Sequence, residues 1–520
     1  MFCRVLVLFL CFLVACGRAP NPPNNTLRIS FAIFPTTFDP RKSGDFISAT
    51  AICLIYEGLT RCLPDGSAEP ALAKRIEISS DGTVYTFHLR KSVWSDGEPV
   101  TARDFERTWK EILDPKTPSL CAYLFYPIKN AEAAFRQEMP LSEVGIRAID
   151  DWTLEVVLER PTPYFLSLTS FPTFLPISER GDMIQNGPFL IDRIEPQSLI
   201  ILKKNPTFWN FANIEIDQIQ INIIPSEPTA FEMFERGELD WLGGLLSPIC
   251  FEALASSHIQ NKVQYFPMSA STFFTFNTSE GLFSNKNIRR AFSLAIDRRE
   301  IADEILPTRQ ILATRCIPPA LCGGKDRELF PPYNPALARE YLKKGLEELG
   351  QTELDPLSLS FRAGPSDRLI AQVIQRKWKD VLGVDVELEQ MDFKTHKDTL
   401  HRRQYQVALA NWVAQYHDPM NILERFKDSD NAKNYPGWEN PEFASLIKAA
   451  QSANNDQQRN LLMEKAEELL AEEIPLLPLF HWSNPSLCHP RLRNIHTTPS
   501  GGVLFERSYV IDSNKLQKSL

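Results

Sequence analysis

The chain has 520 residues, 43% of them hydrophobic and 23% charged, which excludes a disordered, collagen-like or polytopic membrane protein. At about 100–200 residues per domain, this length predicts about three domains. The net charge of −9, from 56 basic and 65 acidic residues, argues against a nucleic-acid partner, because phosphate recognition needs an excess of Lys and Arg.

The N-terminus carries a targeting pattern. Residues 5–15 form an apolar run after Arg4 that is too short to span a membrane and predicts a signal peptide over residues 1–15. The letters LVAC at 13–16 resemble a bacterial lipobox, so we expect Cys16 to be lipidated and residues 16–25 to tether the chain to a membrane. A plain signal peptide with an incidental cysteine is the alternative. Both readings place the mature chain in the periplasm or on the extracytoplasmic face of the cell membrane.

Strands and helices alternate along the rest of the chain. Period-two alternation predicts strands over 27–33, 83–89, 152–158, 199–202 and 214–224, and Thr101 is placed to cap a helix over 101–113. Amphipathic spacing predicts helices over 287–305, 335–349, 366–382 and 457–473, with a strand over 384–388. This mixture without an internal repeat indicates an α/β or α+β fold.

Eight short motifs follow one another in a single order. They are YEGLT at 56–60, YTFHLR at 85–90, WSDGEPVTA at 94–102, RGELD at 236–240, FN at 276–277, RRA at 289–291, AIDR at 295–298 and WKDVLGV at 378–384. Together they resemble the solute-binding proteins of oligopeptide and dipeptide ABC transporters, and most of all those that bind oligopeptides. The resemblance extends from residue 27 to the C-terminus.

The resemblance implies a two-lobe periplasmic-binding-protein fold of the α/β class, type II-like, with an extra inserted domain. Domain I would comprise residues 26–56, 186–270 and 489–520, domain II residues 57–185, and domain III residues 271–488. It further implies a monomer that captures a peptide between its lobes and delivers it to the permease subunits of an ABC importer.

The same resemblance implies a set of ligand-binding residues. They are Gly44, Asp45, Phe46, Arg368, Phe393, His401, Asn411, Trp412, Val413 and Gln415. The first three match a segment that contacts the peptide main chain, and the backbones of Asn411 and Val413 match positions that pair with it. Phe393 and Trp412 match aromatic walls of a side-chain pocket.

The charged positions depart from the family pattern. Where relatives place an aspartate that pairs with the peptide's α-ammonium group, this chain has Gln415. At two positions where relatives have arginines that bind the peptide's C-terminal carboxylate, this chain has Leu400 and Leu409. Because a glutamine loses the ion pair, we expect a buried ammonium to bind about ten-fold more weakly. An atypical ligand, such as a modified or cell-wall peptide or a metal chelate, is therefore the alternative.

No catalytic or metal-binding pattern is present. The chain lacks a G-x-S-x-G elbow, an H-E-x-x-H motif, a P-loop and a C-x-x-C pair, so we predict no enzyme, no metal site and no cofactor. An exported hydrolase, a chaperone or a surface adhesin are the alternatives from other functional classes. Cys316 and Cys322 are close enough in sequence for a small disulfide loop, and the sequence leaves their pairing open.

Overall fold

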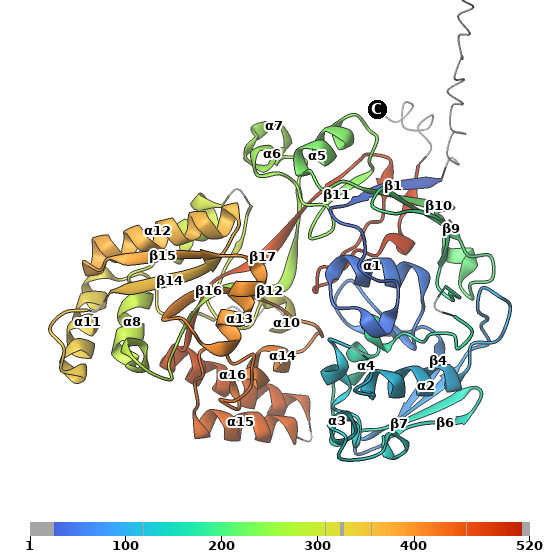
Figure 1. Cartoon of the computed structure of the whole chain (residues 1–520), viewed down its shortest axis with the longest axis horizontal. Helices are drawn as coiled ribbons and strands as arrows, with labels where there is room; N and C mark the ends of the chain where they lie inside the picture. Colours follow the sequence, from blue (N-terminus) through green and yellow to red (C-terminus); the bar gives the residue numbers. More distant parts are fainter. Residues whose placement is uncertain are drawn as a thin grey trace, which may run out of the picture.

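The computed structural model describes residues 25–117, 119–181, 183–306, 308–322, 327–354, 356–453 and 455–511. The predicted lipidation site Cys16 and the side chain of Cys322 lie outside this description. Figure 1 shows two lobes side by side. We call residues 25–262 and 489–511 the first lobe and residues 277–475 the second lobe. The strands between them, β12 (Gln264–Phe276) and β17 (Leu476–Cys488), run from one lobe into the other.

The first lobe contains two sheets. One has the order β1-β10-β9-β8, with β1 and β10 parallel, and the other is antiparallel with the order β4-β5-β7-β6. The strands are β1 (Thr26–Phe31), β4 (Ala73–Ile78), β5 (Val84–Leu89), β6 (Ile146–Asp150), β7 (Thr153–Val157), β8 (Phe189–Glu195), β9 (Leu199–Lys204) and β10 (Gln218–Ile223). Two short ladders add β2 (Thr60–Cys62) with β3 (Ala68–Pro70), and β18 (Leu492–Arg493) with β19 (Tyr509–Val510). The helices are α1 (Phe46–Ile55), α2 (Ala102–Leu113), α3 (Ala131–Phe135), α4 (Phe165–Leu168), α5 (Glu227–Glu235), α6 (Phe251–Ala255) and α7 (Ser257–Gln260).

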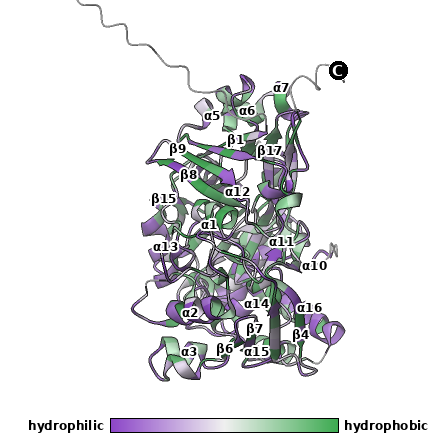
Figure 2. Ribbon diagram, turned by 90° about the vertical axis from the view of Figure 1, so that its right-hand side faces the viewer, coloured by the Kyte–Doolittle hydropathy of each residue, from purple (hydrophilic) through white to green (hydrophobic). Residues whose placement is uncertain are grey.

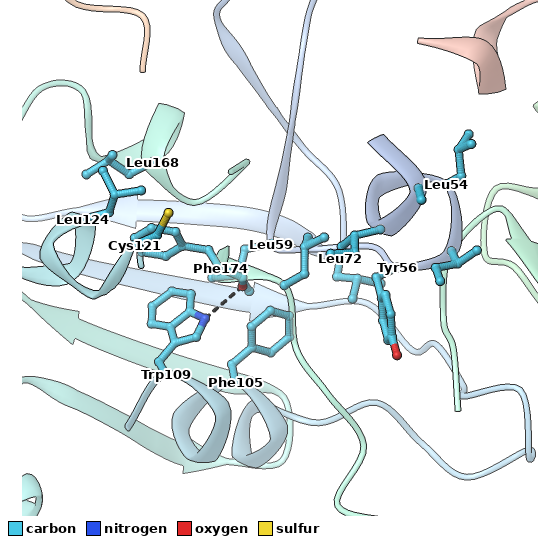
Figure 3. Packing of buried hydrophobic residues seen from close by; sticks show 14 of the residues in the cluster. Leu54, Tyr56, Leu59, Leu72, Phe105, Trp109, Cys121, Leu124, Leu168 and Phe174 are labelled. Carbon is cyan, nitrogen blue, oxygen red and sulfur yellow. Dashed lines mark hydrogen bonds between the residues drawn. The ribbon is translucent and has the colours of Figure 1, made fainter. Parts of the chain in front are cut away.

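Helix α2 shows how the first lobe gains its core. Phe105, Trp109 and Ile112 recur at helical spacing on its buried face and are 0% exposed. Trp109 donates its Nε1–H to the Phe174 carbonyl at 2.8 Å, which satisfies the polar atom of a buried indole (Figure 3). In Figure 2 the same helix shows both hydrophilic and hydrophobic colouring, as expected for a helix with one face packed on a sheet.

The second lobe is built on a mixed sheet. Its order is β11-β17-β12-β16-β14-β15, and β13 pairs with β17. The remaining strands are β11 (Trp241–Gly243), which comes from the first lobe, β13 (Ile311–Leu312), β14 (Leu357–Arg362), β15 (Val386–Met391) and β16 (Val407–Val413). The helices are α8 (Lys286–Leu294), α9 (Arg298–Glu300), α10 (Pro319–Cys322), α11 (Pro335–Leu349), α12 (Pro365–Leu382), α13 (Phe393–Arg402), α14 (Met420–Leu423), α15 (Pro441–Gln451) and α16 (Asp456–Glu473). Within the described ranges, no helix is long and apolar enough to cross a membrane.

Two predicted elements differ from the structure. The helix predicted over 287–305 ends at Leu294, because Asp297 leaves the helical conformation and its carboxylate caps α9 through the Arg299 N–H at 3.1 Å. The strand predicted over 214–224 begins only at Gln218, where pairing with β1 and β9 starts; Ile214 and Ile216 are buried without joining the sheet.

The two ends of the segment 57–185 meet in space. The Asn186 side chain accepts the Glu57 N–H at 3.0 Å and donates to the Glu57 carbonyl at 3.1 Å. The neighbouring Gly187 approaches the end of α1 so closely that a Cβ there would lie 2.5 Å from the Tyr56 nitrogen, so only glycine fits. This contact supports our proposal that the predicted limits of domain II are real domain boundaries.

Asp240, the last residue of the RGELD motif, joins three distant parts of the first lobe. It is 0% exposed and accepts hydrogen bonds from Arg28 Nη2 at 2.8 Å and from Arg491 Nη2 at 2.6 Å. Burial alone would raise the pKa of Asp240, but the hydrogen bonds from Arg491 and Arg28 outweigh it and lower the pKa below its ordinary value. This carboxylate therefore fixes β1 and the C-terminal segment to the strand that follows the motif.

We predict that Asp240→Asn lowers the free energy of unfolding by about 3 kcal/mol at neutral pH, because it leaves two guanidinium groups without their carboxylate. Since the folded-state pKa of Asp240 is lowered, its contribution is full above the ordinary carboxylate pKa and is lost as the pH falls through the folded value. Urea denaturation at about pH 7 and about pH 3 should therefore show the difference between wild type and variant shrinking in acid. Asp385→Asn, at a carboxylate that is 85% exposed, is the control and should change stability by less than about 0.5 kcal/mol. An equal loss at both pH values would contradict the assigned ion network.

Candidate ligand-binding site

A cavity of about 400 Å³ lies between the two lobes. The first lobe contributes residues from 43–62, 170–175 and 498–506 to its wall, and the second lobe contributes residues 413–415, at the end of strand β16. A ligand in this cavity would touch both lobes at once, so its binding would favour the arrangement in which the lobes are close together.

Five of the predicted binding residues line this cavity. Gly44, Asp45 and Phe46 enter it from the start of α1, and Val413 and Gln415 enter it from the end of β16. The Asp45 carboxylate is already used by the fold, because it caps α1 through the Ser48 N–H at 2.8 Å and accepts the Thr36 hydroxyl at 2.7 Å. Asp45 is therefore positioned to offer its backbone, rather than its charge, to a ligand.

Three further predicted residues are absent from the cavity wall and have other partners. Asn411 accepts a hydrogen bond from Thr272 Oγ1 at 2.8 Å, and Trp412 donates its indole N–H to the Asn421 side chain at 2.9 Å. The ring of His401 lies 5.7 Å from the ring of Tyr435. Burial, together with the positive charge of Lys397, lowers the pKa of His401, so this imidazole is neutral at pH 7.

The last two predicted residues do not line the cavity. Phe393 is 64% exposed at the first turn of α13. Arg368 is exposed on α12, where its Nε–H bonds the Gln390 side chain at 2.9 Å. The ligand roles of these two residues, and of His401, Asn411 and Trp412, stay predictions from the resemblance.

One wall of the cavity is acidic. Glu57 and Glu506 both line it, and Arg61, which pairs with Glu57, is the only basic residue on the wall within the described part of the chain. The nearest ion pair of Glu506 is with Arg507 Nε at 3.8 Å. Burial raises the pKa of both glutamates, although the nearby Arg61 opposes the rise. This wall therefore has two glutamate side chains but only one arginine to pair with them.

The two lobes contact each other beside the cavity. The rings of Tyr164 from the first lobe and Tyr416 from the second stack at 4.3 Å with an interplanar angle of 12°. The Tyr123 hydroxyl of the first lobe donates to the Gln415 side-chain carbonyl of the second. The His417 N–H donates to the Ser167 hydroxyl at 3.2 Å. These contacts hold the lobes in apposition around the cavity.

Sequence reasoning missed the residues that carry charge and interlobe contact here. The sequence identified Glu57 only as part of the YEGLT motif and predicted no ligand role for it. No local pattern connects it with Glu506, which lies far away in sequence. Tyr123 and Tyr164 stand in loop-rich stretches without periodicity. Among the described residues, no group of three or more His, Cys, Asp or Glu side chains is placed to hold a metal ion.

Comparisons with known proteins agree with this architecture. The family model described as bacterial extracellular solute-binding proteins, family 5 Middle, matches residues 67–434. The oligopeptide-binding protein OppA of Bacillus subtilis (strain 168) is 34% identical over 512 residues, covering 95% of this chain and 94% of that protein. The OppA structure of Haemophilus influenzae in complex with RPPGFSPFR matches with a TM-score of 0.77 at 26% identity, covering 94% of this chain and 99% of that one. The murein tripeptide-binding protein MppA of Escherichia coli also has a TM-score of 0.77, at 25% identity and with coverage of 94% and 98%.

We predict that Tyr164→Ala shifts the ligand-free protein toward a more open arrangement. A stacked aromatic pair contributes about 0.5–1.5 kcal/mol beyond its buried area, which corresponds to a shift of up to about ten-fold in the ratio of open to closed molecules. Small-angle X-ray scattering should show a larger radius of gyration for this variant. Tyr333→Ala, at a tyrosine that is 38% exposed on the second lobe, is the control and should leave the radius unchanged. Identical scattering from wild type and Tyr164→Ala would show that the stacking does not hold the lobes together.

Proposed function

The chain belongs to family 5 of the bacterial extracellular solute-binding proteins, which are not enzymes, and we propose that it captures peptides between its lobes and delivers them to an ABC importer. The observation that carries this proposal is the cavity whose wall combines the start of α1 with the end of β16. The expected resemblance to peptide-binding proteins and the expected α/β fold are both confirmed by the comparisons. Peptide as the ligand follows from the relatives, one of which is named an oligopeptide-binding protein and another of which was solved in complex with a peptide.

A free strand edge supports a peptide as the ligand. Strand β12 pairs with one side of β16 along its whole length, but on the other side β14 pairs only at Val407 and Ala408. On that side Ala410 to Val413 have no strand partner among the described residues. An extended peptide can satisfy its main-chain groups by adding to such an edge, whatever its side chains are. This would let one cavity accept peptides of different sequence.

Binding would work by a shift of population between open and closed lobes. A peptide that touches both walls has its highest affinity for the closed arrangement and therefore increases its population. The closed form would be the one presented to permease subunits at the membrane. We further propose that Cys16 carries the lipid that keeps the protein there, as a monomer on the extracytoplasmic side.

An atypical ligand remains the second candidate. The observation that favours it is Gln415, whose neutral amide lines the cavity where relatives of the resembled family place an aspartate for the peptide's ammonium group. A modified or cell-wall peptide would need no carboxylate at this position. MppA, named for murein tripeptide, shares the fold over 94% of this chain.

We predict that Ala49→Trp abolishes peptide binding by filling the cavity. Ala49 lies on α1 and lines the cavity, so an indole there would occupy space that the ligand needs. Calorimetric titration with penta-alanine should show at least about ten-fold weaker binding than for the wild type. Ala449→Trp, at an exposed position on α15, is the matched control and should bind normally. Equal affinities for both variants would place the ligand outside this cavity.

We predict that Cys16→Ala releases the protein from the membrane fraction, because a thioether-linked lipid needs the cysteine sulfur. Cell fractionation followed by immunoblotting would measure the distribution, and Cys11→Ala is the control that should remain membrane-bound. Membrane association of Cys16→Ala equal to that of the wild type would rule out this lipidation site.

A further inference from the structure

A small cavity beside Trp412 lies where strands β12 and β17 meet the second lobe. It measures about 10 Å³, and none of the described residues on its wall also lines the larger cavity between the lobes. Its volume is close to the smallest that holds one water molecule. The cavity therefore admits a water or a single-atom ion, and it is too small for a carboxylate, a sulfate or a phosphate.

Arg425 brings a buried positive charge to the wall of this cavity. The residue is 4% exposed, and its guanidinium carbon lies 3.9 Å from the centroid of the Trp412 ring. Its Nε–H donates to the Ile422 carbonyl at 3.2 Å, and the other four N–H groups of the guanidinium have no acceptor within the described ranges. The indole face attracts the cation but leaves its charge in place.

The groups around Arg425 do not supply a bonded counter-charge. Glu424 accepts the Tyr416 hydroxyl at 2.7 Å and forms no ion pair with Arg425 in the described part of the chain. Burial raises the pKa of Cys316, which lines the cavity, to about 12, so this thiol is neutral at pH 7. Lys433 adds a second positive charge, with its Nζ 5.5 Å from the centroid of the same indole ring. The surroundings of the cavity are therefore positive.

Ser269 gives an independent indication of a bound species. It lines the cavity and is 2% exposed, and its hydroxyl has no hydrogen-bond partner among the described residues. Its backbone is fully paired, because its N–H donates to the Pro499 carbonyl at 2.6 Å and its carbonyl accepts the Ala414 N–H at 2.8 Å. A buried hydroxyl without a partner costs free energy, so this fixed side chain indicates an acceptor in the cavity.

The chemistry of the wall favours an anion over a water. Arg425 and Ser269 both present hydrogen-bond donors, and a water that accepted from them would still need acceptors for its own two hydrogens. A water would also leave the buried charge of Arg425 uncompensated, which is costly in the interior of a protein. A monatomic anion accepts hydrogen bonds from several directions and neutralises the guanidinium.

We propose that this cavity is a halide site, in which one chloride ion accepts hydrogen bonds from the Arg425 guanidinium and the Ser269 hydroxyl. The ion connects the second lobe to the hinge, because Ser269 lies in the interval of β12 where the pairing with β17 shifts register. The same serine is bonded through its N–H to Pro499 of the first lobe. The site stands on its own residues and does not depend on peptide capture.

Bromide is the probe for this site, because its anomalous X-ray scattering distinguishes it from water. Crystals of the protein grown in sodium bromide should show an anomalous peak within hydrogen-bond distance of both the Arg425 guanidinium and the Ser269 hydroxyl. Crystals of Arg425→Met should lack that peak. A water in the wild-type cavity, or a peak of equal height in Arg425→Met, would overturn the proposal.

Thermal melting measures the same site in solution. Sodium bromide is titrated against sodium gluconate at constant ionic strength, since gluconate is too large for the cavity. The wild-type Tm should rise with bromide, as it does for any ligand that binds the folded state. Arg425→Met should lose this bromide-specific rise, and Arg376→Met, at an arginine that is 82% exposed, should keep it.

A milder variant keeps the test sharp if Arg425→Met does not fold. Ser269→Ala removes a hydroxyl that has no partner among the described residues, and it should need at least about five-fold more bromide for the same rise in Tm. Ser293→Ala on α8 is the matched control, because Ser293 is also 2% exposed with an unpartnered hydroxyl, and it should respond as wild type. Equal wild-type melting in bromide and gluconate, or a wild-type response of Ser269→Ala, would refute the halide site.

Discussion

The arrangement of the site depends on the backbone pairing of β12 with β17. Their hydrogen bonds extend from Gln264 and Ser486 beside the first lobe to Thr275 and Leu476 inside the second. The pairing is interrupted between Pro267 and Ser271, where the register shifts. An irregular ladder resists bending less than a regular one, so this interruption is where the lobes can change their angle while both strands stay paired at their ends.

Capping residues in the sequence were sufficient to predict the limits of helices that begin and end at such residues. The helix over 335–349 has the predicted limits, because Asn334 caps its start and Gly350 adopts the left-handed conformation that ends it. The break at Asp297 was missed because the apolar spacing continues past it, whereas its side chain competes for the backbone. Strand β17 was missed for the opposite reason. Pro478 and Pro485 argue locally against a strand, yet tertiary pairing with β12 keeps both within β17.

The candidate site, like the fold, could be predicted from the sequence only in part. The cavity collects Gly44 and Phe46 with Val413 and Gln415, residues that the family motifs had already placed on opposite lobes. The charges around it come from positions with no shared local pattern, such as Glu506 near the C-terminus and Glu57 after α1. Sequence periodicity reports which face of an element is buried, whereas the meeting of loops from two lobes is decided only by the complete fold.

The position of Gln415 becomes intelligible when its neighbours are considered together. An aspartate there would also accept the Tyr123 hydroxyl, and it would add a further carboxylate to a cavity already lined by Glu57 and Glu506. A glutamine keeps the hydrogen bond from Tyr123 without adding that charge. Glu57 and Glu506 line the same cavity, which is otherwise largely apolar. Buried carboxylates cost free energy while the cavity is empty and become favourable when a ligand of opposite charge pairs with them, which couples ligand chemistry to closure of the lobes.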